Sequence, residues 1–171
     1  MIIMVNGAFG VGKTTTTELL ATQLPNSIIY DPEEVGYMLW KVTACVEVRG
    51  DFQDLPLWGT LTVIVAEQLR KQYKRTLIVP MTLAHLPYFQ EIKSGLIKLD
   101  PKLYHFCLTA SVATIHARLA KRGDVEGAWS FQQTVRCVQA LQSSEFQEQL
   151  DTEQNKPEAI VKIILSRVRS A

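Results

Sequence analysis

Short apolar runs alternate with longer amphipathic segments along most of the chain. Four of the runs have the length and composition of strands buried on both faces of a parallel sheet. They cover residues 2–5, 27–30, 76–79 and 103–108, and a weaker fifth strand is predicted near 146–151. Between them, apolar residues recur every three or four positions, which predicts helices. The helices are expected at about 13–24, 33–42, 58–75, 86–96, 112–122, 131–141 and 157–169.

This alternation of strands and helices predicts the fold class. It is typical of an α/β protein, a three-layer α/β/α sandwich with a mostly parallel five-stranded sheet and right-handed crossovers. The 171 residues are expected to form a single domain, 1–171, because a chain of this length can bury one continuous core. In the first predicted helix, Leu19, Leu20 and Leu24 lie on one side, which we expect to face that core.

Composition and charge limit the kinds of molecule that this protein is expected to bind. Lys and Arg number 18 against 17 Asp and Glu, a formal net charge of +1, so no overall positive field favours nucleic acid. No apolar run reaches the length of about 18 residues that indicates a membrane span, and the apolar N-terminus is too short for a signal peptide. We therefore expect a cytoplasmic protein with no membrane span and no nucleic acid partner.

The cysteines and histidines show no spacing typical of a metal site or a disulfide framework. We expect three reduced thiols, largely in packing, and histidines in packing or at the surface. These residues are Cys45, Cys107 and Cys137, and His85, His105 and His116.

The segment from Gly7 to Thr14 fits the pattern G-x-x-x-x-G-K-[ST], and it lies between a predicted strand and a predicted helix. That context favours a phosphate loop over a glycine-rich turn that binds nothing. Glycines let successive backbone N–H groups turn around phosphate oxygens, and the helix adds its positive end. The predicted contacts to ATP are Gly7, Ala8, Phe9, Gly10, Val11, Gly12, Lys13, Thr14 and Thr15.

Two side chains of this loop have specific predicted roles. Lys13 can reach the β- and γ-phosphates as a point charge, which makes it a candidate catalytic residue as well as a binding residue. The Thr14 hydroxyl suits a ligand position on Mg²⁺. The sequence thus predicts a P-loop NTPase fold with ATP and Mg²⁺ as cofactors.

A phosphate loop alone does not separate a kinase from a GTPase or a motor ATPase. The chain has no Asn-Lys-x-Asp guanine signature, which argues against a GTPase. The third predicted strand ends in Val79 to Thr82 without an acidic residue, so the usual carboxylate ligand of Mg²⁺ is absent from that position. Which carboxylate replaces it, if any, stays open.

Asp31 follows the second predicted strand, on the edge of the sheet where the phosphate loop lies. A carboxylate there can accept a proton from a substrate hydroxyl or hold a Mg²⁺-bound water. Alternatively, Asp31 caps the helix that begins near Glu33, and the two roles can coexist.

Arg118, Lys121 and Arg122 end a predicted helix before a polar segment at 123–130. We expect a lid at about 118–135 in which Arg118 contacts ATP and Arg122 neutralises charge developing on the transferred phosphate. The alternative is a cation-rich helix end stabilised by the helix dipole. Trp129 is expected to pack in the core or to shield substrate.

An acceptor-binding region is expected at about 31–75, between the second and third strands. Its segment from Asp51 to Trp58 is both acidic and aromatic, which suits a polar ligand that carries a ring. A solvated loop followed by a core aromatic residue explains the same pattern.

Five segments of the chain resemble the tunicamycin-resistance ATP-binding proteins of bacteria. They are residues 4–14, 30–36, 51–58, 79–82 and 118–123, and the similarity extends over nearly the whole chain. These proteins are similar to the nucleoside-monophosphate-kinase branch of P-loop proteins, which includes kinases of sugars, shikimate and chloramphenicol. The resemblance implies ATP binding by residues 7–14, lid roles for Arg118 and Arg122, and a base role for Asp31.

The expected function is transfer of the γ-phosphoryl group of ATP to a hydroxyl of a small molecule, with a role in resistance to tunicamycin, a nucleoside antibiotic, as one candidate. Two alternatives stay open: a non-catalytic, ATP-dependent drug-binding protein, and an ATPase or regulatory switch. The sequence does not identify the acceptor, and it leaves open whether the protein forms a homodimer.

Overall fold

The computed structural model describes residues 1–46, 50–125 and 127–170. Residues 47–49 of the predicted acceptor-binding region and residue 126 of the predicted lid lie outside the described residues. The strands are β1 (Ile2–Gly7), β2 (Ser27–Ile29), β3 (Thr76–Met81), β4 (Tyr104–Thr109) and β5 (Gln149–Asp151). The helices are α1 (Lys13–Gln23), α2 (Glu33–Val42), α3 (Pro56–Tyr73), α4 (Leu86–Leu99), α5 (Val112–Arg122), α6 (Trp129–Leu141) and α7 (Pro157–Arg169).

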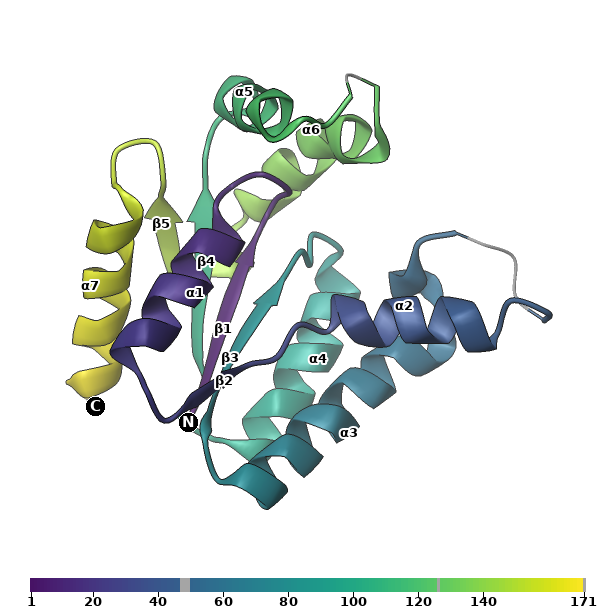
Figure 1. Cartoon of the computed structure of the whole chain (residues 1–171), viewed down its shortest axis with the longest axis vertical. Coiled ribbons are helices and arrows are strands. Elements are labelled where there is room, and N and C mark those ends of the chain that lie inside the picture. Colours follow the sequence, from purple (N-terminus) through teal and green to yellow (C-terminus); the bar gives the residue numbers. More distant parts are fainter. Residues whose placement is uncertain (47–49, 126, 171) are drawn as a thin grey trace.

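The described strands form one parallel sheet in the order β2-β3-β1-β4-β5. Helices α1 and α7 pack together on one face, and α3 and α4 pack together on the other (Figure 1). Helices α5 and α6 lie beyond the carboxyl end of β4 (Figure 1). The predicted three-layer α/β fold is confirmed, and the weak fifth strand is real, although it is shorter than predicted.

The core is centred on β1, whose residues are all buried. Ile2 to Val5 have no exposed surface, as expected for a strand covered on both faces. Trp58 is also a core residue, with 1% of its surface exposed, so that part of the Asp51 to Trp58 segment serves packing. Cys107 and Cys137 are buried and free, and burial raises the pKa of both thiols.

The buried face of α1 extends beyond the predicted leucines, all of which belong to the core or pack against it. Thr16, Thr17 and Leu20 are buried, whereas Leu19 and Leu24 are only partly covered. The Thr17 hydroxyl donates to the carbonyl oxygens of Lys13 at 3.0 Å and Thr14 at 3.1 Å, so it enters the core already hydrogen-bonded. The spacing of apolar residues could not predict this part of the buried face, because it is formed by threonines.

Within the described residues, no helix is both long enough and apolar enough to cross a membrane.

Candidate functional site

The phosphate loop connects the carboxyl end of β1 to the first turn of α1. Gly7 has φ +154°, and a Cβ there would lie 2.7 Å from Val11 Cγ1 and 2.9 Å from the carbonyl oxygen of Leu108. Gly12 has φ +108° and caps α1 in the left-handed conformation. Both positions therefore require glycine, one for space and both for backbone conformation.

Lys13 folds back over this loop. Its ammonium group donates to the carbonyl oxygens of Gly7 at 2.9 Å and Ala8 at 3.0 Å, and it lies 5.6 Å from the centre of the Phe9 ring. Burial lowers the pKa of Lys13 to about 8, although the carboxylate of Glu33 opposes this shift. The loop thus holds a desolvated ammonium group that gains from an anionic partner.

Asp31 occupies the predicted place at the carboxyl edge of the sheet and also acts as a cap. Its Oδ1 accepts a hydrogen bond from the backbone N–H of Glu33 at 2.9 Å. Burial raises the pKa of Asp31, while that hydrogen bond and the charge of Lys13 oppose the rise. The capping interpretation is confirmed, and the position leaves the second carboxylate oxygen for another partner.

Glu33 is a site residue that sequence reasoning missed. Burial raises the pKa of its carboxyl, and Lys13 is the largest opposing influence. The Tyr37 hydroxyl donates to its Oε2 at 3.5 Å. The one available signal was its spacing, two residues after Asp31 and in the first turn of a helix that starts at the sheet edge.

A cavity of about 570 Å³ joins these groups. Most of the predicted site residues line it, namely Phe9, Gly10, Val11, Gly12, Lys13, Thr14, Thr15, Asp31, Arg118 and Arg122. Gly7 and Ala8 are not among the lining residues. The wall also contains Thr16, Glu33, Pro80, Thr152, Asn155, Pro157 and Ile160, none of which the sequence analysis placed in the site. The last four come from the β5–α7 turn and the start of α7, and no motif marks them.

Arg118 connects the phosphate loop to that turn. One guanidinium nitrogen, Nη1, donates to the Val11 carbonyl oxygen at 3.1 Å and to Thr152 Oγ1 at 2.9 Å. The other, Nη2, donates to the Thr152 carbonyl oxygen at 2.8 Å. Arg118 therefore lines the cavity and also links two parts of its wall, the phosphate loop and the β5–α7 turn.

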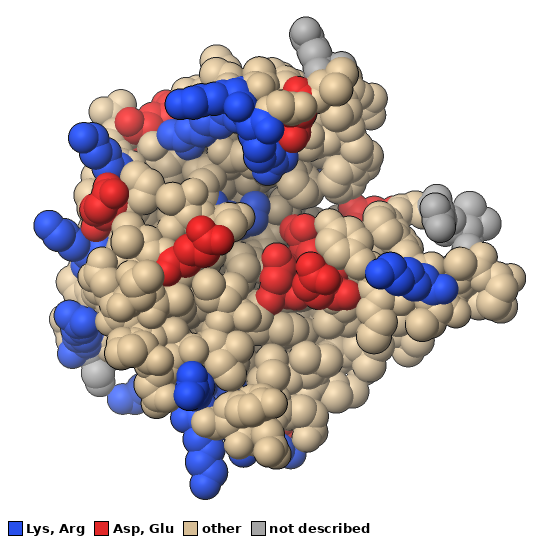
Figure 2. Space-filling view, viewed as in Figure 1, with Lys and Arg blue, Asp and Glu red and all other residues tan. Residues whose placement is uncertain are grey.

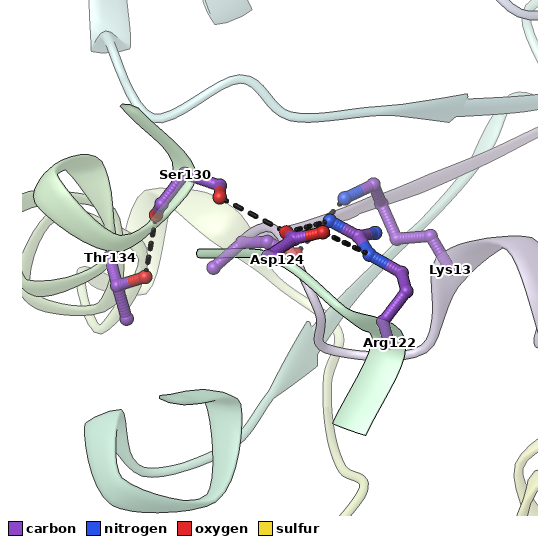
Figure 3. A network of polar contacts seen from close by, with 6 residues as sticks. Lys13, Arg122, Asp124, Ser130 and Thr134 are labelled. Atoms are coloured by element: carbon purple, nitrogen blue, oxygen red, sulfur yellow. Dashed lines mark hydrogen bonds and ion pairs between the residues drawn. The ribbon is translucent and has the colours of Figure 1, made fainter. Parts of the chain in front are cut away.

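Arg122 is held by a carboxylate of its own segment. Its Nε donates to Asp124 Oδ1 at 3.1 Å, and its Nη2 contacts Asp124 Oδ2 (Figure 3). Ser130 donates to the same carboxylate at 3.1 Å, and Thr134 donates to the Ser130 carbonyl oxygen at 2.8 Å. This chain of contacts ties the end of α5 to the start of α6 beside Lys13 (Figure 3).

The expectation that Trp129 packs in the core is wrong. The residue is 49% exposed, and its ring meets Phe9 edge-on with 5.1 Å between centroids. It is the first residue of α6, a helix that lies beyond the carboxyl end of β4 (Figure 1). The contact with Phe9 leaves a shielding role over the phosphate loop.

The cleft has walls of opposite charge. Figure 2 shows Lys and Arg side chains gathered mainly above it and Asp and Glu side chains gathered below it. Arg118 and Arg122 come from α5 on one wall, and Asp31 and Glu33 lie at the start of α2 on the other. Triphosphate suits the cationic wall, and the carboxylates suit a cation or a hydroxyl proton.

The donor set fits Mg²⁺ only together with a nucleotide. In the part of the chain that the structure describes, no group of three His, Cys, Asp or Glu side chains is placed to hold a metal ion. Thr14 supplies an exposed hydroxyl, and Asp31 and Glu33 supply carboxylates on the same cavity. Such a sparse set is typical of Mg²⁺ sites that share their ligands with phosphate oxygens and water.

Comparison of structures shows what this arrangement is similar to. The structure of the Deinococcus radiodurans tunicamycin resistance protein matches with a TM-score of 0.81 and 28% sequence identity, over 98% of this chain and 94% of that one. The predicted resemblance is confirmed. The chain therefore has the architecture of a tunicamycin-resistance protein along almost its entire length.

Two kinase structures share the fold at lower identity. A gluconokinase from Sinorhizobium meliloti 1021 has a TM-score of 0.67 and 16% identity, over 97% of this chain and 91% of that one. Shikimate kinase from Acinetobacter baumannii has a TM-score of 0.61 and 14% identity, over 99% and 93%. No protein-family model and no curated protein matches the chain. The fold is that of P-loop small-molecule kinases.

Proposed function

We propose that this protein transfers the γ-phosphoryl group of ATP to a hydroxyl of a small molecule. The observation that carries the proposal is the convergence of Lys13, Asp31 and Glu33 on one cavity beside the phosphate loop. An ammonium group and carboxylates line that cavity together, and phosphoryl transfer to an alcohol uses a phosphate-binding cation and a proton-accepting group. The shared kinase fold supports the same reaction class.

Each residue has a role in this scheme. The backbone N–H groups of residues 8–13 and the Lys13 ammonium hold the phosphates. Arg118 and Arg122 face the phosphates from α5 and neutralise charge as the bond to the leaving oxygen breaks. Asp31 accepts the acceptor hydroxyl proton on Oδ2, because its Oδ1 is already engaged by the Glu33 N–H.

Mg²⁺ would be held by Thr14 and the carboxylates of Asp31 and Glu33, directly or through water, together with phosphate oxygens of the nucleotide. When bound, it neutralises phosphate charge and orients the γ-phosphate. Burial raises the pKa of both carboxyls, and a bound cation would favour their ionised forms.

We further propose that the region of about residues 31–75, which includes α2 and α3, binds the acceptor, and that residues of about 118–135 form the lid. The role in tunicamycin resistance rests on the likeness to the Deinococcus radiodurans protein. Tunicamycin carries uridine and sugar hydroxyls, which are chemically suitable acceptors. Because the reaction consumes ATP, and because Cys45 is an exposed free thiol, we assign the protein to the cytoplasm.

One observation favours a second candidate, a non-catalytic protein that sequesters a drug while ATP is bound. Pro80, rather than an acidic residue, lines the cavity at the end of β3. Nucleotide binding without transfer tolerates the loss of that metal ligand better than catalysis does.

The deciding experiment compares Asp31→Asn with wild type. The asparagine oxygen can still accept from the Glu33 N–H, so the fold and ATP binding should persist. Mass spectrometry of nucleoside antibiotics and hydroxylated metabolites incubated with ATP should show addition of one phosphate with wild type. The variant should lose at least about a hundredfold in rate, the scale of a general base.

Glu34→Gln is the matched control, because Glu34 lies on the same helical turn but is exposed and outside the cavity. A normal transfer rate in Asp31→Asn would remove the proposed base. Drug resistance that survives in Asp31→Asn cells without any phosphorylated product would favour sequestration.

A further inference from the structure

We propose that the acceptor carries no negative charge: it is a neutral or amine-bearing hydroxyl compound. This inference rests on the proposed function and names the substrate class for the same site. It follows from how charge is divided between the two walls of the cleft.

The wall on the acceptor side is acidic where it meets the cavity. Asp31 and Glu33 both line the cavity. Of the described residues on this wall that line the cavity, none is cationic. An anionic acceptor would therefore approach two carboxylates with no positive partner on that wall, and its binding would be weakened.

The cations of the site face the nucleotide instead. Lys13 lies on the carbonyl oxygens of Gly7 and Ala8, inside the phosphate loop. Arg118 is fixed by Val11 and Thr152. These two positions suit the triphosphate, and Lys13 also partly offsets the charges of Asp31 and Glu33 from the phosphate-loop side.

Arg122 is the remaining cation of the cavity, and Asp124 already neutralises it. Its pKa is raised by that carboxylate. A triphosphate with Mg²⁺ still carries net negative charge, so the bound nucleotide brings no net positive charge of its own toward the acceptor.

The short 3₁₀ helix at Phe52–Asp54 (η1), which packs against α2 and α3, continues the same pattern. Asp51 caps it by accepting from the Gln53 N–H at 3.0 Å, and Asp54 accepts from the Tyr88 hydroxyl at 2.9 Å. Arg136 of α6 is the cation that acts on Asp51, and it opposes the burial that raises the pKa of that carboxyl. Asp51, Asp54 and Arg136 all lie outside the lining of the cavity, and the charge of Arg136 is offset by that of Asp51.

Aromatic rings supply the other contacts available beside the cavity. Phe9 and Trp129 meet edge-on on the lid side, and Tyr37 stands beside Glu33 on α2 with 40% of its surface exposed. Aromatic faces bind the apolar faces of ring compounds and attract amines. Together with carboxylates that accept hydrogen bonds, they select a hydroxylated ring without negative charge.

The first test measures the potential of the site without knowing the acceptor. Protein saturated with Mg²⁺ and a non-hydrolysable ATP analogue is titrated with a cationic and an anionic nitroxide, and amide NMR signals are followed. At residues 33–37 the cationic probe should broaden signals at least threefold more than the anionic probe. Equal or stronger broadening by the anionic probe would overturn the inference.

Residues 71–75 provide the internal control. Lys71, Lys74 and Arg75 line a separate basic cavity that also includes Arg70 and Lys98, at the opposite end of the sheet. There the anionic probe should give the stronger broadening, which verifies that both nitroxides report charge.

The second test uses matched acceptors: uridine with uridine monophosphate, and glucitol with gluconate. Phosphoryl transfer should show kcat/KM at least tenfold higher for the uncharged member of a pair. Glu33→Gln should reduce this preference at least threefold, whereas Glu34→Gln should leave it unchanged. Preferred use of the anionic members would refute the inference while upholding the proposed transferase. If no acceptor is phosphorylated but the nitroxides give the expected broadening, the proposed transferase is refuted, whereas the charge preference of the site is supported.

Discussion

The side chain of Asn6 joins β1 to the segment after β3 through two hydrogen bonds with the backbone of Leu83. Its Nδ2 donates to the Leu83 carbonyl oxygen at 2.9 Å, and its Oδ1 accepts from the Leu83 N–H at 2.9 Å. The same oxygen accepts from the Gly7 N–H at 2.8 Å. Asn6 is fully buried, so one amide fixes both the start of the phosphate loop and the end of the neighbouring strand.

Asn6→Ala should therefore destabilise the protein by about 2–4 kcal/mol. The variant leaves buried backbone groups of Leu83 and Gly7 without partners, each at a cost of about 1–3 kcal/mol that partial rehydration reduces. Urea denaturation followed by circular dichroism measures the loss. Asn26→Ala, at an exposed position, is the control and should stay within about 0.5 kcal/mol of wild type. Equal stabilities of the two variants would show that the amide is dispensable.

Lys13 should make nucleotide binding sensitive to pH. In the free protein the pKa of Lys13 is lowered to about 8, and phosphate favours the protonated form. Binding above pH 8 must then include proton uptake, so ATP affinity should fall as pH rises, by up to about tenfold per unit. Calorimetric titrations at pH 7, 8 and 9 test this. Lys13→Ala should bind at least about tenfold more weakly at pH 7 and lose the pH dependence, whereas Lys162→Ala should match wild type.

The lowered pKa of Lys13 should also make the free energy of unfolding depend on pH. The unfolded chain keeps Lys13 protonated up to about pH 10.4, whereas the folded chain releases the proton near pH 8. Between these values the unfolded state binds more protons, so the contribution of Lys13 to stability rises with pH across that window. At pH 7 its burial costs stability, and Lys13→Met without nucleotide should melt above wild type. A lower melting temperature for Lys13→Met would contradict the desolvation of this ammonium group.

Asp124 should restrain Arg122 until nucleotide is bound. Asp124→Asn removes the charged partner of the guanidinium, so Arg122 becomes free to meet phosphate, and KM for ATP should fall or stay unchanged. Arg122→Gln should lower the rate of transfer or hydrolysis at least about tenfold, because a phosphate-neutralising charge is lost. Steady-state kinetics of both variants, with Lys121→Gln as the control, separate the restraint that Asp124 places on Arg122 from the charge that Arg122 supplies to the phosphate. An equal loss in Lys121→Gln would mean that α5 supplies only general positive charge.

Gly36 should tolerate no side chain, although it lies within a helix where alanine is ordinarily better. A Cβ at Gly36 would lie 2.4 Å from the ring of Phe52, which is itself packed against Trp40 and Trp58. Gly36→Ala should cost about 1–3 kcal/mol in chemical denaturation. Gly50→Ala, where a Cβ meets nothing within 4 Å, is the matched control. A gain in stability for Gly36→Ala would show that Phe52 moves freely.

The sequence alone determined the order of elements and the phosphate loop. Strands such as 2–5 and helices such as 112–122 follow from local periodicity, because a pattern of apolar residues fixes which face of a short segment is buried. The loop from Gly7 to Thr14 was predictable because its glycines, lysine and threonine all act within one strand-to-helix turn. Asp31 followed from its place after a strand.

Only the tertiary structure decided which distant residues complete the site. Thr152 meets Arg118 because β5 pairs with β4 at the edge of the sheet, and no local pattern encodes that pairing. Glu33 joins Asp31 through the direction in which α2 leaves the sheet, and Trp129 is exposed because α6 starts beyond the reach of the core. Short-range patterns specify segments, whereas the walls of a cleft arise from packing between segments far apart in the chain, which depends on sheet order and side-chain volume.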